Sequence, residues 1–210
     1  LLKNINMKSL MNHEYVSIGS QNSTHRIILL HGWGADENDL LPIGKAIIQD
    51  LFFQFEIISL KAPTPCSNNF GRQWYSLFPP NWNEAEIALD KLLETLKEFD
   101  KNGISLKKTI LLGFSQGAAM ALNAGLKLDF GLVISCSGYP HPRWDPIRNN
   151  PVLISHGLQD NVVPIDASRE ISIQLKNNKI SNTKLYEYNC SHSIHPDFIE
   201  VIRLKIKELF

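Results

Sequence analysis

The sequence GFSQG at residues 113–117 has the spacing G-x-S-x-G, which places a serine on a sharp turn between a strand and a helix. An apolar run, TILL at 109–112, precedes it, and a run of small residues, AAMAL at 118–122, follows it. The hydroxyl of such a serine lies beside a helix N-terminus, whose free N–H groups favour a developing negative charge. We therefore predict that Ser115 is a nucleophile rather than a serine that only caps a helix.

A serine hydroxyl is a poor nucleophile until a histidine takes its proton and a carboxylate orients that histidine. When the serine lies on a strand-to-helix turn of this kind, the acid follows it in the chain and the histidine comes last. Asp160 lies five residues after the apolar run VLIS at 152–155, and we predict it to be the acid. Asp166 is the competing carboxylate, but it better suits the first turn of the next helix.

Two histidines compete for the role of base, because both follow the apolar run KLYEY at 184–188. His192 lies within the loop itself, whereas His195 directly precedes Pro196, where a helix is expected to begin. We predict that His192 is the base and that His195 has a helix-entry or surface role. Cys190 is interpreted as an incidental thiol.

The loop after the apolar run RIILL at 26–30 reads HGWGAD, and its two glycines permit a tight turn around Trp33. Acyl transfer on this kind of site needs one oxyanion donor from such a loop and one from the residue after the nucleophile. We predict that the backbone N–H groups of Trp33 and Gln116 are these donors, so that the identity of either side chain matters little. His31 and His156, which also follow strands, are expected to support their loops.

Residues 62–82 form a long loop rich in proline and aromatic side chains. Three interpretations apply to it: a pocket for an acyl or alkyl group, a partial lid, or packing onto the body of the protein. Trp74 is the best single candidate for a substrate-binding residue.

The elements that must position these residues follow from the hydrophobic pattern. Continuous apolar runs predict strands that are buried on both faces, and amphipathic stretches alternate with them. This alternation predicts a single α/β domain, with a mostly parallel sheet and helices on both faces, over residues 16–210. Residues 1–15 are expected to be a flexible N-terminal extension. The expected strands are 26–30, 56–60, 109–112, 131–135, 152–155 and 184–188, and the expected helices 38–51, 84–101, 116–127, 165–178 and 197–209.

Composition excludes several classes of protein. Lys and Arg number 21, as do Asp and Glu, so the chain has no net charge with which to bind nucleic acid or an anionic membrane. No apolar run reaches the length of a membrane span, and we expect no integral membrane association. Cys66, Cys136 and Cys190 have neither a disulfide-framework nor a zinc spacing. We therefore expect a cytoplasmic protein without a bound metal.

Several blocks of this sequence together resemble the phospholipase/carboxylesterase family of small α/β-hydrolases, which includes acyl-protein thioesterases. They are LLHGWGADENDLLP, GRQWYSL, GFSQGAAMAL, HGLQDNVVP and SHSI, and the resemblance extends from about residue 24 to residue 205. It implies a domain without a large cap, a triad of Ser115, Asp160 and His192, and oxyanion donors at Trp33 and Gln116. It also favours His192 over His195, because SHSI aligns with a GHxI-like block in the family.

The expected activity is that of a serine hydrolase of carboxylic esters or thioesters, acting through an acyl-enzyme. The resemblance implies small-molecule esters, lysophospholipids or acylated proteins as substrates, and no cofactor. A non-catalytic binding protein of the same fold is a rival, although such a protein is expected to have lost a triad residue. A small peptidase is a weaker rival because no second domain is present to select a peptide. The sequence fits an acyltransferase as well as a hydrolase. It also fits a monomer as well as a homodimer.

Overall fold

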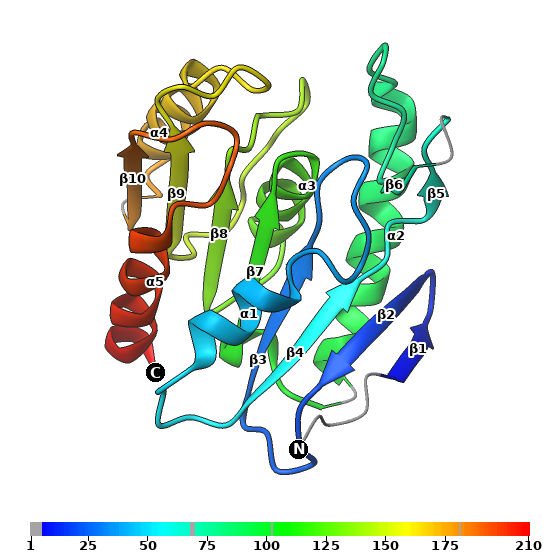
Figure 1. Cartoon of the computed structure of the whole chain (residues 1–210), viewed down its shortest axis with the longest axis vertical. Coiled ribbons are helices and arrows are strands. Elements are labelled where there is room, and N and C mark those ends of the chain that lie inside the picture. Colours follow the sequence, from blue (N-terminus) through cyan, green and yellow to red (C-terminus); the bar gives the residue numbers. More distant parts are fainter. Residues whose placement is uncertain (1–5, 68–69, 102, 181) are drawn as a thin grey trace.

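The computed structural model of the 210-residue chain describes residues 6–67, 70–101, 103–180 and 182–210. Its centre is an eight-stranded sheet in the order β1-β2-β4-β3-β7-β8-β9-β10 (Figure 1). Six neighbouring strands of this order run parallel to one another: β4, β3, β7, β8, β9 and β10. The pairings of β1 with β2 and of β2 with β4 are antiparallel. The strands are β1 (Asn6–Leu10), β2 (His13–Ile18), β3 (His25–Leu30), β4 (Phe55–Leu60), β7 (Thr109–Phe114), β8 (Leu132–Cys136), β9 (Val152–Gly157) and β10 (Thr183–Tyr188).

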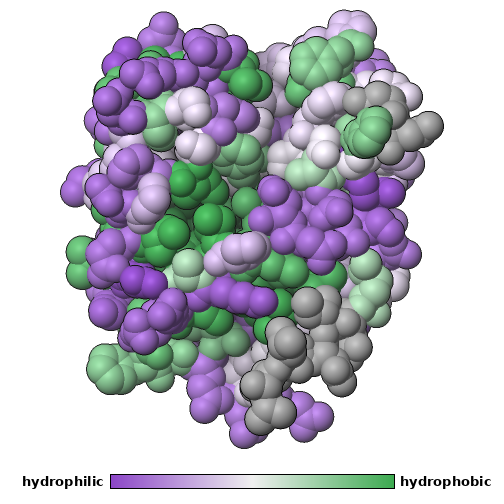
Figure 2. All heavy atoms as spheres, in the orientation of Figure 1, coloured by the Kyte–Doolittle hydropathy of each residue, from purple (hydrophilic) through white to green (hydrophobic). Residues whose placement is uncertain are grey.

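Helices cover both faces of this sheet. In Figure 1, α1 and α5 lie on the near face, and α2, α3 and α4 lie behind it. Figure 2 shows hydrophobic side chains gathered in the middle of the near face, between α5 and α1, with polar ones around them. The described helices are α1 (Leu41–Ile48), α2 (Trp82–Lys101), α3 (Gln116–Gly125), α4 (Asp166–Asn177), α5 (Pro196–Leu209) and the short 3-10 turn Leu106–Lys108.

The central strands are buried on both faces, which explains their continuous apolar sequences. Successive side chains of a strand point to opposite faces. In β3, Ile27 and Leu29 therefore join the core under α1 and α5, whereas Ile28 and Leu30 join the core under α2, α3 and α4. All six strands and all five helices predicted from these patterns are confirmed, with small shifts at their ends.

The N-terminal region differs from the flexible extension expected over residues 1–15. Residues 6–10 form β1, and β2 begins at His13, so this region is a hairpin at the edge of the sheet; residues 1–5 lie outside the described residues. Val16 is buried, and His13 bonds to Thr95 of α2 through its ring. The expectation of a flexible extension was wrong. A short, half-exposed edge hairpin carries few apolar residues, so its sequence resembles that of a polar tail.

A second, two-stranded sheet lies within the 62–82 segment and consists of β5 (Thr64–Pro65) and β6 (Arg72–Gln73). The predicted catalytic residues all follow strands at the carboxyl edge of the large sheet, where ligands bind in open α/β folds. Among the described residues, no helix combines the length and apolar character needed to cross a membrane.

Candidate active site

Ser115 lies on the turn between β7 and α3, with a φ of 54° and a ψ of −117°. A positive φ is unusual for a residue with a side chain, and the surrounding structure must hold it. The Ser115 N–H donates to Cys136 O at 2.8 Å. A Cβ added at Gly113 would lie 2.2 Å from Gly117 O, and one added at Gly117 would lie 2.0 Å from Leu30 O. Close packing of backbone therefore requires both glycines of the motif.

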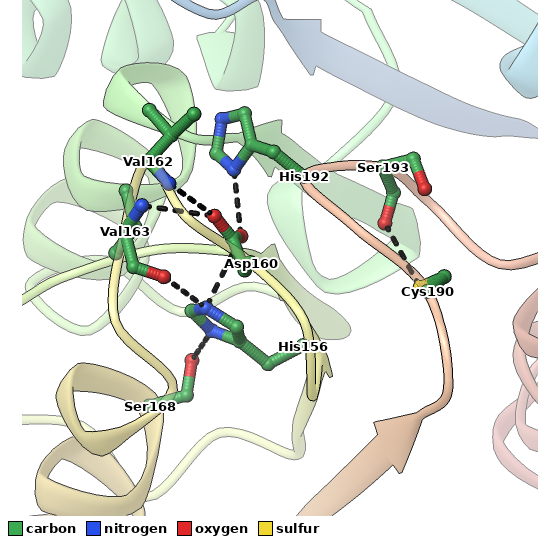
Figure 3. Close-up of polar contacts among 8 residues, drawn as sticks. All are labelled: His156, Asp160, Val162, Val163, Ser168, Cys190, His192 and Ser193. Carbon is green, nitrogen blue, oxygen red and sulfur yellow. Dashed lines mark hydrogen bonds and ion pairs between the residues drawn. The ribbon is translucent and has the colours of Figure 1, made fainter.

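The structure brings Asp160 and His192 together (Figure 3). His192 Nδ1 lies 2.7 Å from Asp160 Oδ2, and the Asp160 side chain is fully buried. The other carboxylate oxygen, Oδ1, accepts the N–H groups of Val162 and Val163, each at 2.9 Å. The loop after β9 thus holds both oxygens of the carboxylate, and one of them is directed at the histidine.

Burial alone would raise the pKa of the Asp160 carboxyl. The hydrogen bond from His192 and those from the N–H groups of Val163 and Val162 outweigh burial and hold the pKa below its ordinary value. The carboxylate is therefore ionised at neutral pH. An ionised partner at Nδ1 fixes the His192 ring so that Nε2 is the nitrogen available to take a proton.

The competing residues have other tasks. Asp166 is the first residue of α4 and pairs with Arg169 at the surface. His195 caps the N-terminus of α5, where its ring accepts the N–H of Asp197, and it stacks on Tyr188. The sequence-based choice of Asp160 over Asp166, and the helix-entry position of His195, agree with these contacts.

The described contacts include no hydrogen bond between the side chains of Ser115 and His192, although the residue next to Ser115 contacts the His192 ring. The ring of Phe114, the residue before Ser115, has its centroid 4.7 Å from that of His192. Nucleophile and base are often separated by more than hydrogen-bond distance before substrate binds. The structure thus joins Asp160 to His192 and places the residue before Ser115 against the His192 ring.

The predicted oxyanion loop lies against Ser115. A Cβ added at Gly32 would lie 3.4 Å from the Cβ of Ser115. Within the described part of the chain, the N–H groups of Trp33 and Gln116 donate to no protein acceptor. Free donors on either side of a nucleophile are what an oxyanion site requires.

Buried contacts hold this loop from behind. His31 Nε2 accepts the N–H of Ala62 at 3.2 Å, so Nδ1 carries the hydrogen and donates to Gly32 O at 2.8 Å. Burial lowers the pKa of His31 and keeps the ring neutral. The indole N–H of Trp74 donates to His31 O at 2.9 Å. The supporting role predicted for His31 is confirmed.

The 62–82 segment both supports the site and borders it. Arg72 exchanges backbone hydrogen bonds with the oxyanion loop, since Gly34 N–H donates to Arg72 O and Arg72 N–H donates to Ala35 O. Trp74 is 1% exposed, so its contacts favour a place behind the loop rather than the substrate-binding role predicted for it. Phe78, in contrast, is 75% exposed and packs edge-on against Trp33.

The side chain of Gln116 has a task that the motif did not reveal. It is fully buried, its Oε1 accepts the N–H of Trp74 at 3.0 Å, and its Nε2 donates to Tyr75 O at 2.8 Å. This amide therefore clamps the 62–82 segment to the start of α3. The sequence-based expectation concerned only the backbone N–H of Gln116 as an oxyanion donor, and it did not reveal these contacts of the side chain.

The described residues contain no group of three or more His, Cys, Asp or Glu side chains placed to hold a metal ion. The chemistry available at this edge of the sheet is that of a serine hydroxyl, an imidazole, a buried carboxylate and two free amide donors. Together these groups are suited to nucleophilic acyl transfer.

The chain is similar to known esterases and to an acyl-protein thioesterase. Esterase YpfH of Escherichia coli is 27% identical over 166 residues, which cover 74% of this chain and 71% of that protein. Acyl-protein thioesterase 1 homolog 2 of Dictyostelium discoideum is 32% identical over 168 residues, which cover 67% of this chain and 73% of that one. The crystal structure of esterase PE8 matches with a TM-score of 0.82 and 27% identity over 98% of both chains.

A carboxylesterase from Mesorhizobium loti has the same fold, with a TM-score of 0.82 over 98% of this chain and 99% of that one, at 18% identity. The sequence profile of the phospholipase/carboxylesterase family matches residues 11–209, which is nearly the whole chain. The protein therefore belongs to the phospholipase/carboxylesterase family of α/β-hydrolases and is a carboxylic ester hydrolase.

Proposed function

We propose that this protein is a serine hydrolase that cleaves carboxylic esters or thioesters through a covalent acyl-enzyme on Ser115. The observation that carries the proposal is the 2.7 Å contact of His192 with the buried Asp160 carboxylate, together with Ser115 on a strained strand-to-helix turn whose preceding residue, Phe114, contacts the His192 ring. An ionised carboxylate that fixes an imidazole next to such a serine is the arrangement that activates a hydroxyl.

In the first half of the proposed reaction, His192 Nε2 takes the proton of the Ser115 hydroxyl while Oγ attacks the acyl carbon. The backbone N–H groups of Trp33 and Gln116 donate to the resulting oxyanion. As the tetrahedral intermediate collapses, the bond to the leaving group breaks, and His192 gives its proton to the leaving alcohol or thiol. In the second half His192 takes a proton from water, whose oxygen attacks the acyl carbon; when the bond to Ser115 Oγ breaks, His192 gives this proton to Oγ and the carboxylic acid is released.

The substrates we propose are acyl esters and thioesters of small molecules, lysophospholipids or acylated proteins. Two relatives carry the names esterase and acyl-protein thioesterase. Exposed apolar side chains on loops at the carboxyl edge of the sheet support an apolar acyl group, among them Phe78 at 75% and Val162 at 65% exposure. The three cysteines are unpaired, which supports the predicted reducing, cytoplasmic compartment.

Hydrolysis of p-nitrophenyl esters from acetate to palmitate tests the proposal, with Ser115→Ala measured in parallel. We expect turnover by the natural sequence and its near-complete loss in the variant, with an unchanged melting temperature. Activity limited to short chains would indicate a small-ester substrate, and activity on long chains would indicate lipids or acylated proteins. Substantial turnover by Ser115→Ala would refute the assignment of the nucleophile.

A further inference from the structure

A second histidine, His156, lies against the buried carboxylate on the side opposite His192 (Figure 3). His156 belongs to β9 and is 1% exposed. Its Nε2 lies 2.8 Å from Val163 O and 3.3 Å from Asp160 Oδ2, the same oxygen that contacts His192. Its Nδ1 lies 2.6 Å from the hydroxyl of Ser168, which is fully buried in the first turn of α4.

These partners fix the position of the hydrogen on the ring. A carbonyl oxygen only accepts, so Nε2 must carry the hydrogen that Val163 O receives. The same N–H faces Asp160 Oδ2 as a second, longer acceptor. When only Nε2 carries a hydrogen, Nδ1 accepts the hydroxyl hydrogen of Ser168. Every polar atom of the buried ring therefore has a partner, and the donor is directed at the carboxylate loop.

His156 contacts Val163, the residue whose N–H binds the Asp160 carboxylate. Val163 donates its N–H to Asp160 Oδ1, while its carbonyl oxygen accepts the N–H of His156. Through Ser168, His156 also ties this loop to α4. Three segments, β9, the loop after it and α4, thus meet at one imidazole, and Asp160 Oδ2 cannot turn away from His192 without disturbing them.

We propose that His156 is a positioning residue for ester hydrolysis, which acts through Asp160 by holding Oδ2 in line with Nδ1 of His192. The inference rests on the proposed function, because it assigns a task within that catalytic site. A mere supporting role, as in any buried histidine, would affect stability alone. A positioning role lowers the rate of the chemical step at each folded active site.

A matched pair of variants separates these two roles. His156→Met and His156→Gln have side chains of similar length, and only glutamine retains an N–H donor for Val163 O and an acceptor for Ser168. We expect His156→Met to lower kcat about 10–100-fold, as small displacements of catalytic groups do, with KM changed less than about threefold. His156→Gln should recover most of this loss. The kcat values are expressed per active serine, titrated with a fluorophosphonate probe.

His25→Met provides the control, because His25 is also buried. It is the first residue of β3, at the end of that strand away from the candidate site, and it packs against Phe53, Phe55 and Phe210. His25→Met should lower the melting temperature and leave kcat per active serine unchanged. Normal kcat in His156→Met, or equal losses in the methionine and glutamine variants, would overturn the proposal. An equal loss of kcat in His25→Met would do the same.

If His156→Met gives no folded protein, Ser168→Ala replaces it. Loss of the Ser168 hydroxyl leaves Nδ1 of the His156 ring without its partner. We expect kcat to fall about 3–10-fold at constant KM, which is less than the loss expected for His156→Met. An unchanged kcat would overturn the inference. Failure of the proposed function is distinguishable, because the natural sequence would then neither hydrolyse esters nor react with the fluorophosphonate at Ser115.

Discussion

Replacing Gln116 by methionine tests whether the 62–82 segment holds the oxyanion loop in place. Methionine fills a similar volume but makes neither of the two hydrogen bonds of the glutamine amide, which accepts from Trp74 N–H at 3.0 Å and donates to Tyr75 O at 2.8 Å. The backbone N–H of residue 116, the proposed oxyanion donor, remains in the variant. Any loss of activity therefore comes from the side chain.

The structure allows the size of both effects to be worked out. Trp74 and Tyr75 are each 1% exposed, so a buried N–H and a buried C=O lose their partners. Each unsatisfied group costs about 1–3 kcal/mol, so the two together should lower the free energy of unfolding by about 2–6 kcal/mol. Deleting an oxyanion donor lowers kcat about 100–1,000-fold. In Gln116→Met the backbone donor at Trp33 is still present but is held less firmly, so we expect kcat to fall by about 10–100-fold.

Urea unfolding and the hydrolysis of p-nitrophenyl butyrate measure the two effects separately. Asn123→Leu is the matched control, because the Asn123 amide is buried in the same helix and donates to Ala119 O, away from the 62–82 segment. It should lower stability with little change in kcat. A Gln116→Met variant with normal kcat, or an Asn123→Leu variant with an equal loss, would show that the clamp has no part in catalysis.

Three further predictions concern other parts of the molecule. His192→Ala should abolish hydrolysis of p-nitrophenyl butyrate, whereas His195→Ala should change kcat less than about threefold, since His195 caps α5 and stacks on Tyr188; the reverse pattern would exchange the two assignments. Gly71→Ala should lower the melting temperature and kcat together, because Gly71 has a φ of 66° and an added Cβ would lie 1.9 Å from Gly34 O; a normal melting temperature would contradict this. Burial lowers the pKa of His13 and of His141 to about 4, from an ordinary 6.5. The unfolded chain then binds more protons between these pH values, so the free energy of unfolding should fall as pH drops from 6.5 to 4, by about 1.4 kcal/mol per unit for each histidine. Urea titrations over this range check the slope, and a flat profile would count against neutral, buried rings.

The central strands could be predicted from the sequence, as could the order in which the candidate site residues follow them along the chain. Both depend on short stretches of local sequence. A strand buried on both faces must be apolar at nearly every position, as in β3 and β7, and the residue that follows it then lies at the carboxyl edge of the sheet. Asp160 and His192 could therefore be found by their distance from apolar runs. Their 2.7 Å contact could not be derived in this way, because it depends on how β9 and β10 pair.

The features that the sequence did not predict depend on contacts between distant segments. The edge hairpin from Asn6 to Ile18 has a half-exposed pattern in β2, which resembles that of a polar extension. Trp74 was interpreted as a pocket residue because its aromatic type suits either a pocket or the core. Only the packing of the 62–82 segment behind His31 distinguishes the two. The Gln116 clamp was missed because the motif concerns the backbone at that position.

The two halves of the site are supported by different parts of the chain. The proposed oxyanion side depends on residues 62–82, through the Gln116 clamp and the Trp74–His31 contact. The proposed acid–base side depends on the loop after β9 and on α4, through Val163 and Ser168. Ser115 lies between them on the turn from β7 to α3, where close backbone packing fixes both of its neighbouring glycines. A turn with close backbone packing therefore carries the proposed nucleophile, while each adjacent loop is oriented by its own buried polar contacts. Such an arrangement allows the exposed parts of these loops, such as Phe78 and Val162, to vary with the substrate without moving the catalytic groups.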